Sequence, residues 1–187
     1  MPPGACELWF GDWGHDGGDD LTRIAPEPED KAPTGMAVPD GGVVVSATNA
    51  AHSWSTAYGV AGPGTTLTLY FGGAGGAGSV GTYKSDGGGR IDFANGHSWR
   101  RASPLYTYST HEGKNVKGAC ADAPGGNSDL EGCDSDDDCQ FKCGCAADCL
   151  GYVDMSAKGW GYRLKNYVSH NCRVSLSGFV LRIKAHA

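Results

Sequence analysis

The 187-residue sequence lacks the features that mark several common classes of protein. No window approaches the roughly 18 consecutive apolar residues of a transmembrane helix, so none is predicted. Lys and Arg total 15 against 21 Asp and Glu, and the formal net charge is −6. The basic residues form no run along the chain that would contact phosphates. This charge balance argues against nucleic acid as a partner and against attachment to an anionic membrane surface.

Sequence signatures of catalysis are also missing. The chain contains no GxSxG, HExxH, P-loop or dinucleotide-binding motif. It has six histidines, but a Ser/His/Asp set can be picked from any chain of this size and carries no information by itself. We therefore predict that the protein is not an enzyme and that it requires no cofactor.

Helical periodicity is absent, whereas alternation of apolar and polar residues recurs. Residues 65–71 place Leu67 and Leu69 on one face of a strand. Residues 81–101 read as a small meander whose last turn is a tight primed turn at Asn95-Gly96. Further strands are expected at residues 5–13 and 43–45, and two more within residues 166–187.

These strands define the expected fold class. It is mainly β: an antiparallel β-sandwich or jelly-roll-like domain with a small disulfide-rich, loop-dominated segment. We expect a glycine-rich β domain at 1–118, a cysteine-rich segment at 119–150 and C-terminal strands at 151–187 that complete the β domain. The 31 glycines make folding costly in entropy, and crosslinks would offset part of that cost.

The eight cysteines are best explained as disulfides. No CxxC pair occurs, so neither a zinc ribbon nor a thioredoxin-type redox site is predicted, and a thiolate metal cluster is the remaining alternative. Disulfides indicate an extracellular location or an oxidising organelle lumen. Residues 1–18 lack the basic and apolar regions of a signal peptide, so we expect that a targeting segment was removed. Cys143 and Cys145 would share a face of an extended segment and should pair with different partners.

The acidic stretch between the first two cysteines of the cluster offers Asp134, Asp136 and Asp138 as oxygen ligands for calcium. An EF-hand loop starting at Asp134 would place Cys139 where the motif requires glycine. We therefore prefer a solvated acidic turn and predict no metal.

The spacing Cys133-x5-Cys139-x3-Cys143-x-Cys145-x3-Cys149, with Cys120 upstream, resembles that of knottin modules such as the squash-type inhibitors. The resemblance covers residues 120–149 and concerns cysteine spacing only. The first segment is longer than in that family, the last is shorter, and no inhibitory loop is recognisable. The resemblance therefore implies crosslinks rather than protease inhibition. The pairing that it implies is Cys120–Cys143, Cys133–Cys145 and Cys139–Cys149, which leaves Cys6–Cys172.

Aromatic residues suggest a binding role. Five tryptophans and eight tyrosines supply flat apolar faces on which sugar rings stack, although we expect at least three of the tryptophans to be buried in the core. The stretch FGDWGHDGGDD has the composition of a mixed nitrogen and oxygen metal site, but a glycine-rich acidic loop is the commoner meaning.

We predict a contact surface made of loops 11–20 and 72–90, because loops this rich in glycine suit close backbone approach to a ligand. Its aromatic contacts would be Trp13 and Tyr83, and its polar contacts Asp12, His15 and Asp86. The predicted function is a non-catalytic, disulfide-stapled module that recognises carbohydrate or a surface. The alternative is an accessory subunit docked on a larger protein assembly in an oxidising lumen.

Overall fold

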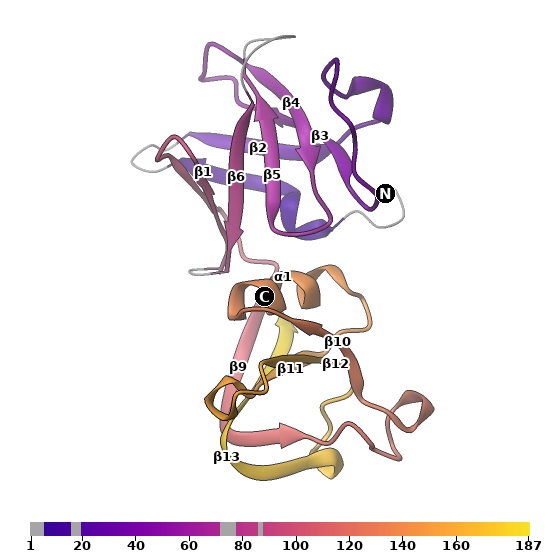
Figure 1. The fold of residues 1–187 in the computed structure, drawn as a ribbon. Helices are drawn as coiled ribbons and strands as arrows, with labels where there is room; N and C mark the ends of the chain where they lie inside the picture. The colour runs from indigo at the N-terminus through magenta and orange to yellow at the C-terminus, as the bar shows by residue number, and fades with distance from the viewer. Residues whose placement is uncertain (1–5, 16–19, 72–77, 86–87) are drawn as a thin grey trace. The chain divides into compact units, whose positions relative to one another are not determined.

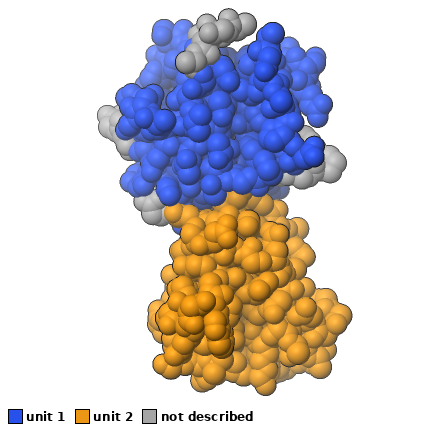
Figure 2. Space-filling model, viewed as in Figure 1, with its two compact units in different colours: residues 1–104 blue, residues 105–187 orange. Residues whose placement is uncertain are grey.

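The structure is a computed structural model that describes residues 6–15, 20–71, 78–85 and 88–187. The chain divides into two compact units, residues 1–104 and 105–187 (Figure 2). The division falls after Pro104, whereas the sequence suggested a boundary at 118. No described helix is long and apolar enough to cross a membrane. The chain is mainly β, as predicted.

The first unit is a closed antiparallel barrel (Figure 1). Each strand pairs with the next, and β1 pairs with β8. We expected a sandwich or a jelly roll, and this strand order is neither. Among the described residues, closure gives every barrel strand a neighbour on both sides, which removes the free edges of an open sheet. The strands are β1 Gly11–His15, β2 Leu21–Pro26, β3 Val43–Thr48, β4 Thr56–Ala61, β5 Thr66–Tyr70, β6 Ser79–Lys84, β7 Arg90–Phe93 and β8 Ser98–Arg101.

Alternation along the strands builds the barrel core. Leu67 and Leu69 of β5 are fully buried, which confirms the predicted inward face. Three tryptophans, Trp9, Trp13 and Trp99, are also buried, as expected. Trp13 Nε1 donates a hydrogen bond to the Trp9 carbonyl oxygen over 3.1 Å, so the short 3₁₀ helix Glu7–Trp9 is held against the barrel. Most of residues 5–13, predicted as one strand, is therefore this helix followed by the start of β1.

The turn between β7 and β8 differs from the predicted primed turn. Gly96 has φ +88°, and its N–H donates to the Phe93 carbonyl over 2.9 Å. A primed turn of type I′ would need a positive φ at Asn95 as well, and Ser55 is the only described non-glycine residue with a positive φ. The hairpin instead has a turn without positive φ, followed by Gly96 in the left-handed αL conformation. This arrangement is the next most common loop in short hairpins.

The second unit is a five-stranded sheet in the order β10-β12-β11-β13-β9. We predicted two strands within residues 166–187, but one long strand runs there and carries a register shift between Ser175 and Val180, near Gly178 with φ +82°. The strands at 151–187 therefore pair within this second sheet rather than with the barrel. The strands are β9 Tyr106–Val116, β10 Asp129–Cys133, β11 Gly151–Asp154, β12 Tyr162–Lys165 and β13 Arg173–His186.

The α-helix α1, Asp136–Cys145, lies in the segment that was predicted to be loop. Its start is fixed by a reciprocal cap: Asp138 N–H donates to Ser135 Oγ over 3.2 Å, and Asp134 N–H donates to Asp138 Oδ2 over 2.9 Å. Three aspartates in the first turn also favour the positive end of the helix dipole. Cys143 and Cys145 are therefore helical rather than extended.

The described cysteines are all oxidised. Disulfides join Cys120 to Cys172, Cys133 to Cys139 and Cys143 to Cys149. Cys6 and Cys145 are disulfide-bonded as well. Cys143 and Cys145 do have different partners, as predicted. The pairing implied by the knottin resemblance is wrong, including Cys6–Cys172. The reason is geometric, because α1 places Cys139 and Cys143 beside the strand and loop that flank the helix.

Candidate functional site

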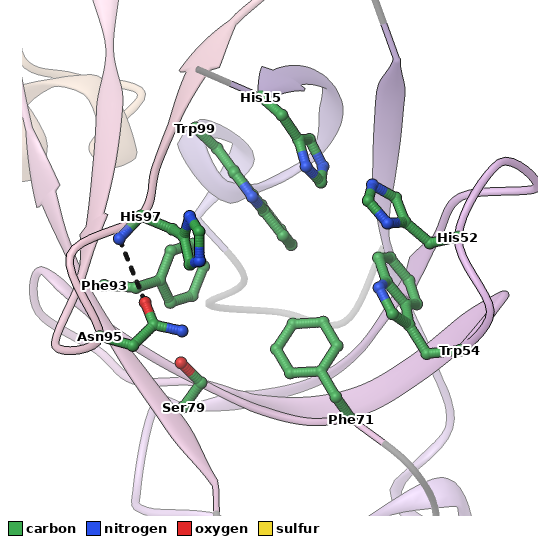
Figure 3. Close-up of a pocket in the computed structure, with 9 residues that line it drawn as sticks. All are labelled: His15, His52, Trp54, Phe71, Ser79, Phe93, Asn95, His97 and Trp99. Carbon is green, nitrogen blue, oxygen red and sulfur yellow. Dashed lines mark hydrogen bonds between the residues drawn. The ribbon is translucent and has the colours of Figure 1, made fainter. Parts of the chain in front are cut away.

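A pocket of about 360 Å³ lies at one end of the barrel. Antiparallel strands place the ends of β1, β5 and β7 and the starts of β4, β6 and β8 at the same rim. The lining side chains come from these strand ends and from the turns between them (Figure 3). They are His15, His52, Trp54, Phe71, Ser79, Phe93, Asn95, His97 and Trp99.

Four of the rings form a continuous stack along one side of the pocket. Trp99 stacks on His15 with centroids 4.8 Å apart, and His15 stacks on His52 at the same centroid distance of 4.8 Å. His52 in turn stacks on Trp54 at 5.4 Å, with the planes inclined by 13°. In this row the faces of His15 and His52 are covered by their neighbours, so these two imidazoles expose only ring edges to the pocket.

Phe71 completes the circle on the opposite side. Its ring meets Trp54 edge-on at 5.1 Å and Trp99 edge-on at 6.3 Å. The rings of Trp99, His15, His52, Trp54 and Phe71 therefore surround the opening (Figure 3). Contacts of this kind prefer offset or perpendicular geometry, which fixes each ring relative to its neighbours.

Polar groups gather at one part of the rim. Asn95 and His97 are exposed in the β7–β8 turn, and Ser79 begins β6 beside them (Figure 3). Asn95 Oδ1 accepts a hydrogen bond from the His97 backbone N–H over 3.2 Å, which orients the amide. The amide nitrogen of Asn95 and the hydroxyl of Ser79 remain available to a ligand, because the structure gives neither a hydrogen bond within the described residues.

Two buried polar side chains, those of Thr22 and Asn49, position the imidazole of His15. Its Nε2 lies 2.5 Å from the hydroxyl of Thr22, and Asn49 Nδ2 donates to the same hydroxyl over 3.1 Å. Both Thr22 and Asn49 are buried. Burial lowers the pKa of His15, the neighbouring His52 and His97 lower it further, and Asp20 opposes them. The imidazole is therefore neutral at physiological pH, and the Thr22 hydroxyl can donate to its unprotonated nitrogen.

The predicted contact residues are distributed differently from the expectation. His15 lines the pocket, whereas Trp13 and Tyr83 lie in the barrel interior with 0% and 4% exposure and offer no ring to a ligand. Asp12 is exposed and lies 3.9 Å from Arg23, away from the pocket lining. Asp86 lies outside the described residues.

The predicted loops are also partly strands. Residues 11–15 are β1 and residues 79–84 are β6. Residues 16–19, 72–77 and 86–87, which belong to the same predicted loops, lie outside the described part of the chain. Sequence reasoning missed His52, Trp54, Phe71 and Trp99. The available signal was that aromatic residues recur just where predicted strands begin or end.

Two of the three aspartates considered for calcium, Asp136 and Asp138, have structural partners instead. Asp136 accepts hydrogen bonds from Tyr152 Oη over 2.7 Å and from Gln140 Nε2 over 2.9 Å. Burial and the Asp136 carboxylate raise the pKa of Tyr152. Asp138 caps α1 and lies 3.1 Å from Lys142 Nζ. In the described part of the chain, no group of three or more His, Cys, Asp or Glu side chains is placed to hold a metal ion.

The pocket thus offers aromatic side chains and a polar rim, and the half-buried imidazole of His15 is hydrogen-bonded to a buried hydroxyl behind it. That hydroxyl belongs to Thr22, which has no exposed surface and cannot touch a ligand in the pocket. What the pocket binds has to follow from the chemistry of its lining. Neither a protein-family model, nor a curated protein sequence, nor a solved structure matches this chain.

Proposed function

We propose that the protein is a non-catalytic binding module whose barrel pocket recognises a carbohydrate. The observation that supports this most is the circle of five aromatic rings, from Trp99 through His15, His52 and Trp54 to Phe71, around a pocket with a polar rim. Proteins hold sugars by this division of labour between flat apolar faces and a few hydrogen-bonding groups.

A sugar ring matches both parts of the lining. Its C–H bonds form an apolar face that packs on indole and phenyl rings, while its hydroxyls need donors and acceptors at the edge. Trp54 and Phe71 supply the half-buried faces, and Asn95, His97 and Ser79 supply the edge. A volume of about 360 Å³ is at the lower end of small-molecule sites, so a terminal sugar residue or a disaccharide fits better than a long chain.

The absence of catalysis is part of the proposal. Nucleophilic catalysis needs a hydroxyl or thiol that is hydrogen-bonded to a base and also reaches the substrate. At this pocket the hydroxyl bonded to His15 is that of the buried Thr22. The disulfides support an extracellular or lumenal location for such a module, because they persist in oxidising compartments.

A second candidate function is that of an accessory subunit docked on a larger assembly. One observation favours it: Trp160 of the second unit is 69% exposed and contacts only the edge of Phe179, with centroids 5.8 Å apart, among the ring contacts described. A large exposed aromatic side chain is typical of protein interfaces. The native mass of the protein from its source separates the two functions, because a subunit would be recovered in a complex.

A glycan array followed by calorimetric titration tests the carbohydrate proposal. We expect Trp54→Ala to weaken binding of the best glycan about tenfold or more, since lost stacking of about 1.4 kcal/mol corresponds to tenfold. Asn95→Ala, at an exposed rim position, should weaken binding and lower the melting temperature only slightly, because the turn hydrogen bond that it removes is exposed to solvent. Tyr58→Ala is the matched control, because Tyr58 is an exposed aromatic residue of the same barrel outside the pocket. No binding to any glycan, or equal losses for Trp54→Ala and Tyr58→Ala, would overturn the proposal.

A further inference from the structure

A second cavity, also of about 360 Å³, lies in the unit formed by residues 105–187. Its lining differs completely from that of the barrel pocket. All four lining residues carry basic side chains: His111, Lys114, His170 and Arg173. In a chain with a formal net charge of −6, a cavity lined only by cationic and protonatable groups is unexpected.

The backbone around this cavity is firmly held. His111 and Lys114 belong to β9, Arg173 begins β13, and His170 lies in the 3₁₀ turn His170–Cys172 just before it. The Cys120–Cys172 disulfide anchors that turn, and Lys117 N–H donates to the Cys172 carbonyl over 3.0 Å. The four side chains are therefore brought together by a rigid frame rather than by a free loop.

Three of the lining side chains have neutral hydrogen-bond partners. Arg173 Nε donates to the Val168 carbonyl over 2.8 Å, which leaves the two terminal nitrogens of the guanidinium group for another acceptor. Lys114 Nζ donates to Ser175 Oγ over 2.7 Å and keeps two further N–H donors. His111 Nε2 lies 3.3 Å from Ser109 Oγ.

Charge compensation is missing from the cavity. Within the described chain, none of the four lining residues forms an ion pair with a carboxylate, and no carboxylate lines the cavity. Glu112 follows His111 on β9, and Asp122 accepts a hydrogen bond over 3.3 Å from Asn171, the residue after His170, but neither carboxylate lines the cavity. Like charges gathered without a counter-ion repel one another, and a bound anion would remove that repulsion.

We propose that this cavity binds a tetrahedral oxyanion, the sulfate or phosphate group of a free ion or of an ester. The guanidinium group of Arg173 can donate two parallel hydrogen bonds to two oxygens of such a group. Lys114 and the two histidines approach from other segments of the chain and supply single donors. Donors from several directions suit a tetrahedral group better than a planar carboxylate. This site lies outside the barrel and does not depend on carbohydrate binding there.

Titration at constant ionic strength, followed through the imidazole NMR signals of His111 and His170, tests the proposal. The probes are sodium sulfate, sodium phosphate and sodium acetate. We expect saturable shifts with sulfate or phosphate, and at least tenfold weaker binding in Arg173→Gln. Lys114→Gln is a second variant that should also weaken anion binding. Lys114 is exposed, so its replacement should not affect folding. Lys117→Gln removes the same charge from an exposed position outside the cavity and should change the affinity less than twofold.

Glucose 6-sulfate and glucose 6-phosphate, compared with glucose, distinguish the two sources of the anion. Tighter binding of an ester than of the free ion identifies an ester-bearing ligand, and equal binding identifies the inorganic ion. Shifts that rise linearly without saturation overturn the proposal. So does a Lys117→Gln variant that loses as much affinity as Lys114→Gln, because the effect would then be general electrostatic attraction. Acetate that binds as tightly as sulfate excludes a tetrahedral site.

Discussion

The imidazole of His15 is stacked between two rings, with Trp99 on one face at 4.8 Å and 22° and His52 on the other at 4.8 Å and 19°. Such a position suits a neutral ring, because both faces are covered and a second imidazole lies within contact distance. The lowered pKa of His15 has the same causes, with burial the largest. The aromatic circle is therefore sensitive to acid at this residue.

We predict that the barrel loses stability as the pH falls below about 6.5, the ordinary pKa of histidine. Because the pKa of His15 is lower in the folded state, the unfolded state binds more protons between the two pKa values, and the free energy of unfolding falls as pH falls. The stability that neutral His15 contributes is fully present above about pH 6.5. It is lost as the pH falls through the lowered pKa that His15 has in the folded state. Urea unfolding of wild type and His15→Gln between pH 8 and 5 measures it. Parallel pH profiles for the two proteins would refute the assignment.

Gly59 of β4 faces the neighbouring strand too closely for any side chain. A Cβ atom there would lie 1.9 Å from the backbone oxygen of Thr68 on β5. We predict that Gly59→Ala lowers the free energy of unfolding by at least about 3 kcal/mol, because the pairing of β4 with β5 has to shift. Gly64→Ala is the control, since nothing lies within 4 Å of its added Cβ. Denaturant unfolding followed by tryptophan fluorescence should show little change for Gly64→Ala, and similar losses in both variants would contradict the packing argument.

The disulfides of the second unit close loops of very different length. Cys120 and Cys172 are 52 residues apart, whereas Cys143 and Cys149 are 6 apart. Loop entropy predicts a loss of about 4 kcal/mol when the first pair is replaced by alanines, and about 2 kcal/mol for the second. Guanidinium unfolding of the two double variants compares them directly. Equal losses would show that chain entropy does not dominate the contribution of these crosslinks.

Local patterns predicted several strands of the barrel, because alternation is a property of neighbouring residues. Leu67 and Leu69 are buried as their spacing indicates, and the meander of residues 81–101 forms β6, β7 and β8. Closure of the barrel depends on Trp13 pairing with Arg101, and no local pattern encodes a contact over that distance. The helix α1 was not predicted, because its segment was interpreted from its cysteines and aspartates alone. The spacing of Ser135 and Asp138 is nevertheless that of a helix N-cap, and the structure contains this cap.

The pocket could be predicted only in part, for a related reason. His15 was predicted as a contact residue because it belongs to a glycine-rich loop, and it does line the pocket. Trp13 was chosen on the same grounds and is in the core, because side chains two residues apart differ in depth where a strand approaches the barrel rim. Bringing His52, Phe71 and Trp99 together requires the strand order of a closed barrel. Single-sequence reasoning does not supply that order.

The strand order of the barrel also has a consequence for how the chain folds. Every pairing in it joins consecutive strands except that between β1 and β8. Hairpins can therefore be added one after another, and joining the first strand to the last is the step that carries the large loop-closure entropy. The same pairing places Gly14 opposite Arg100, so the two ends of the barrel segment are neighbours. A chain that ends before β8 would therefore leave both β1 and β7 with an unpaired edge, so the barrel cannot close until its last strand is present.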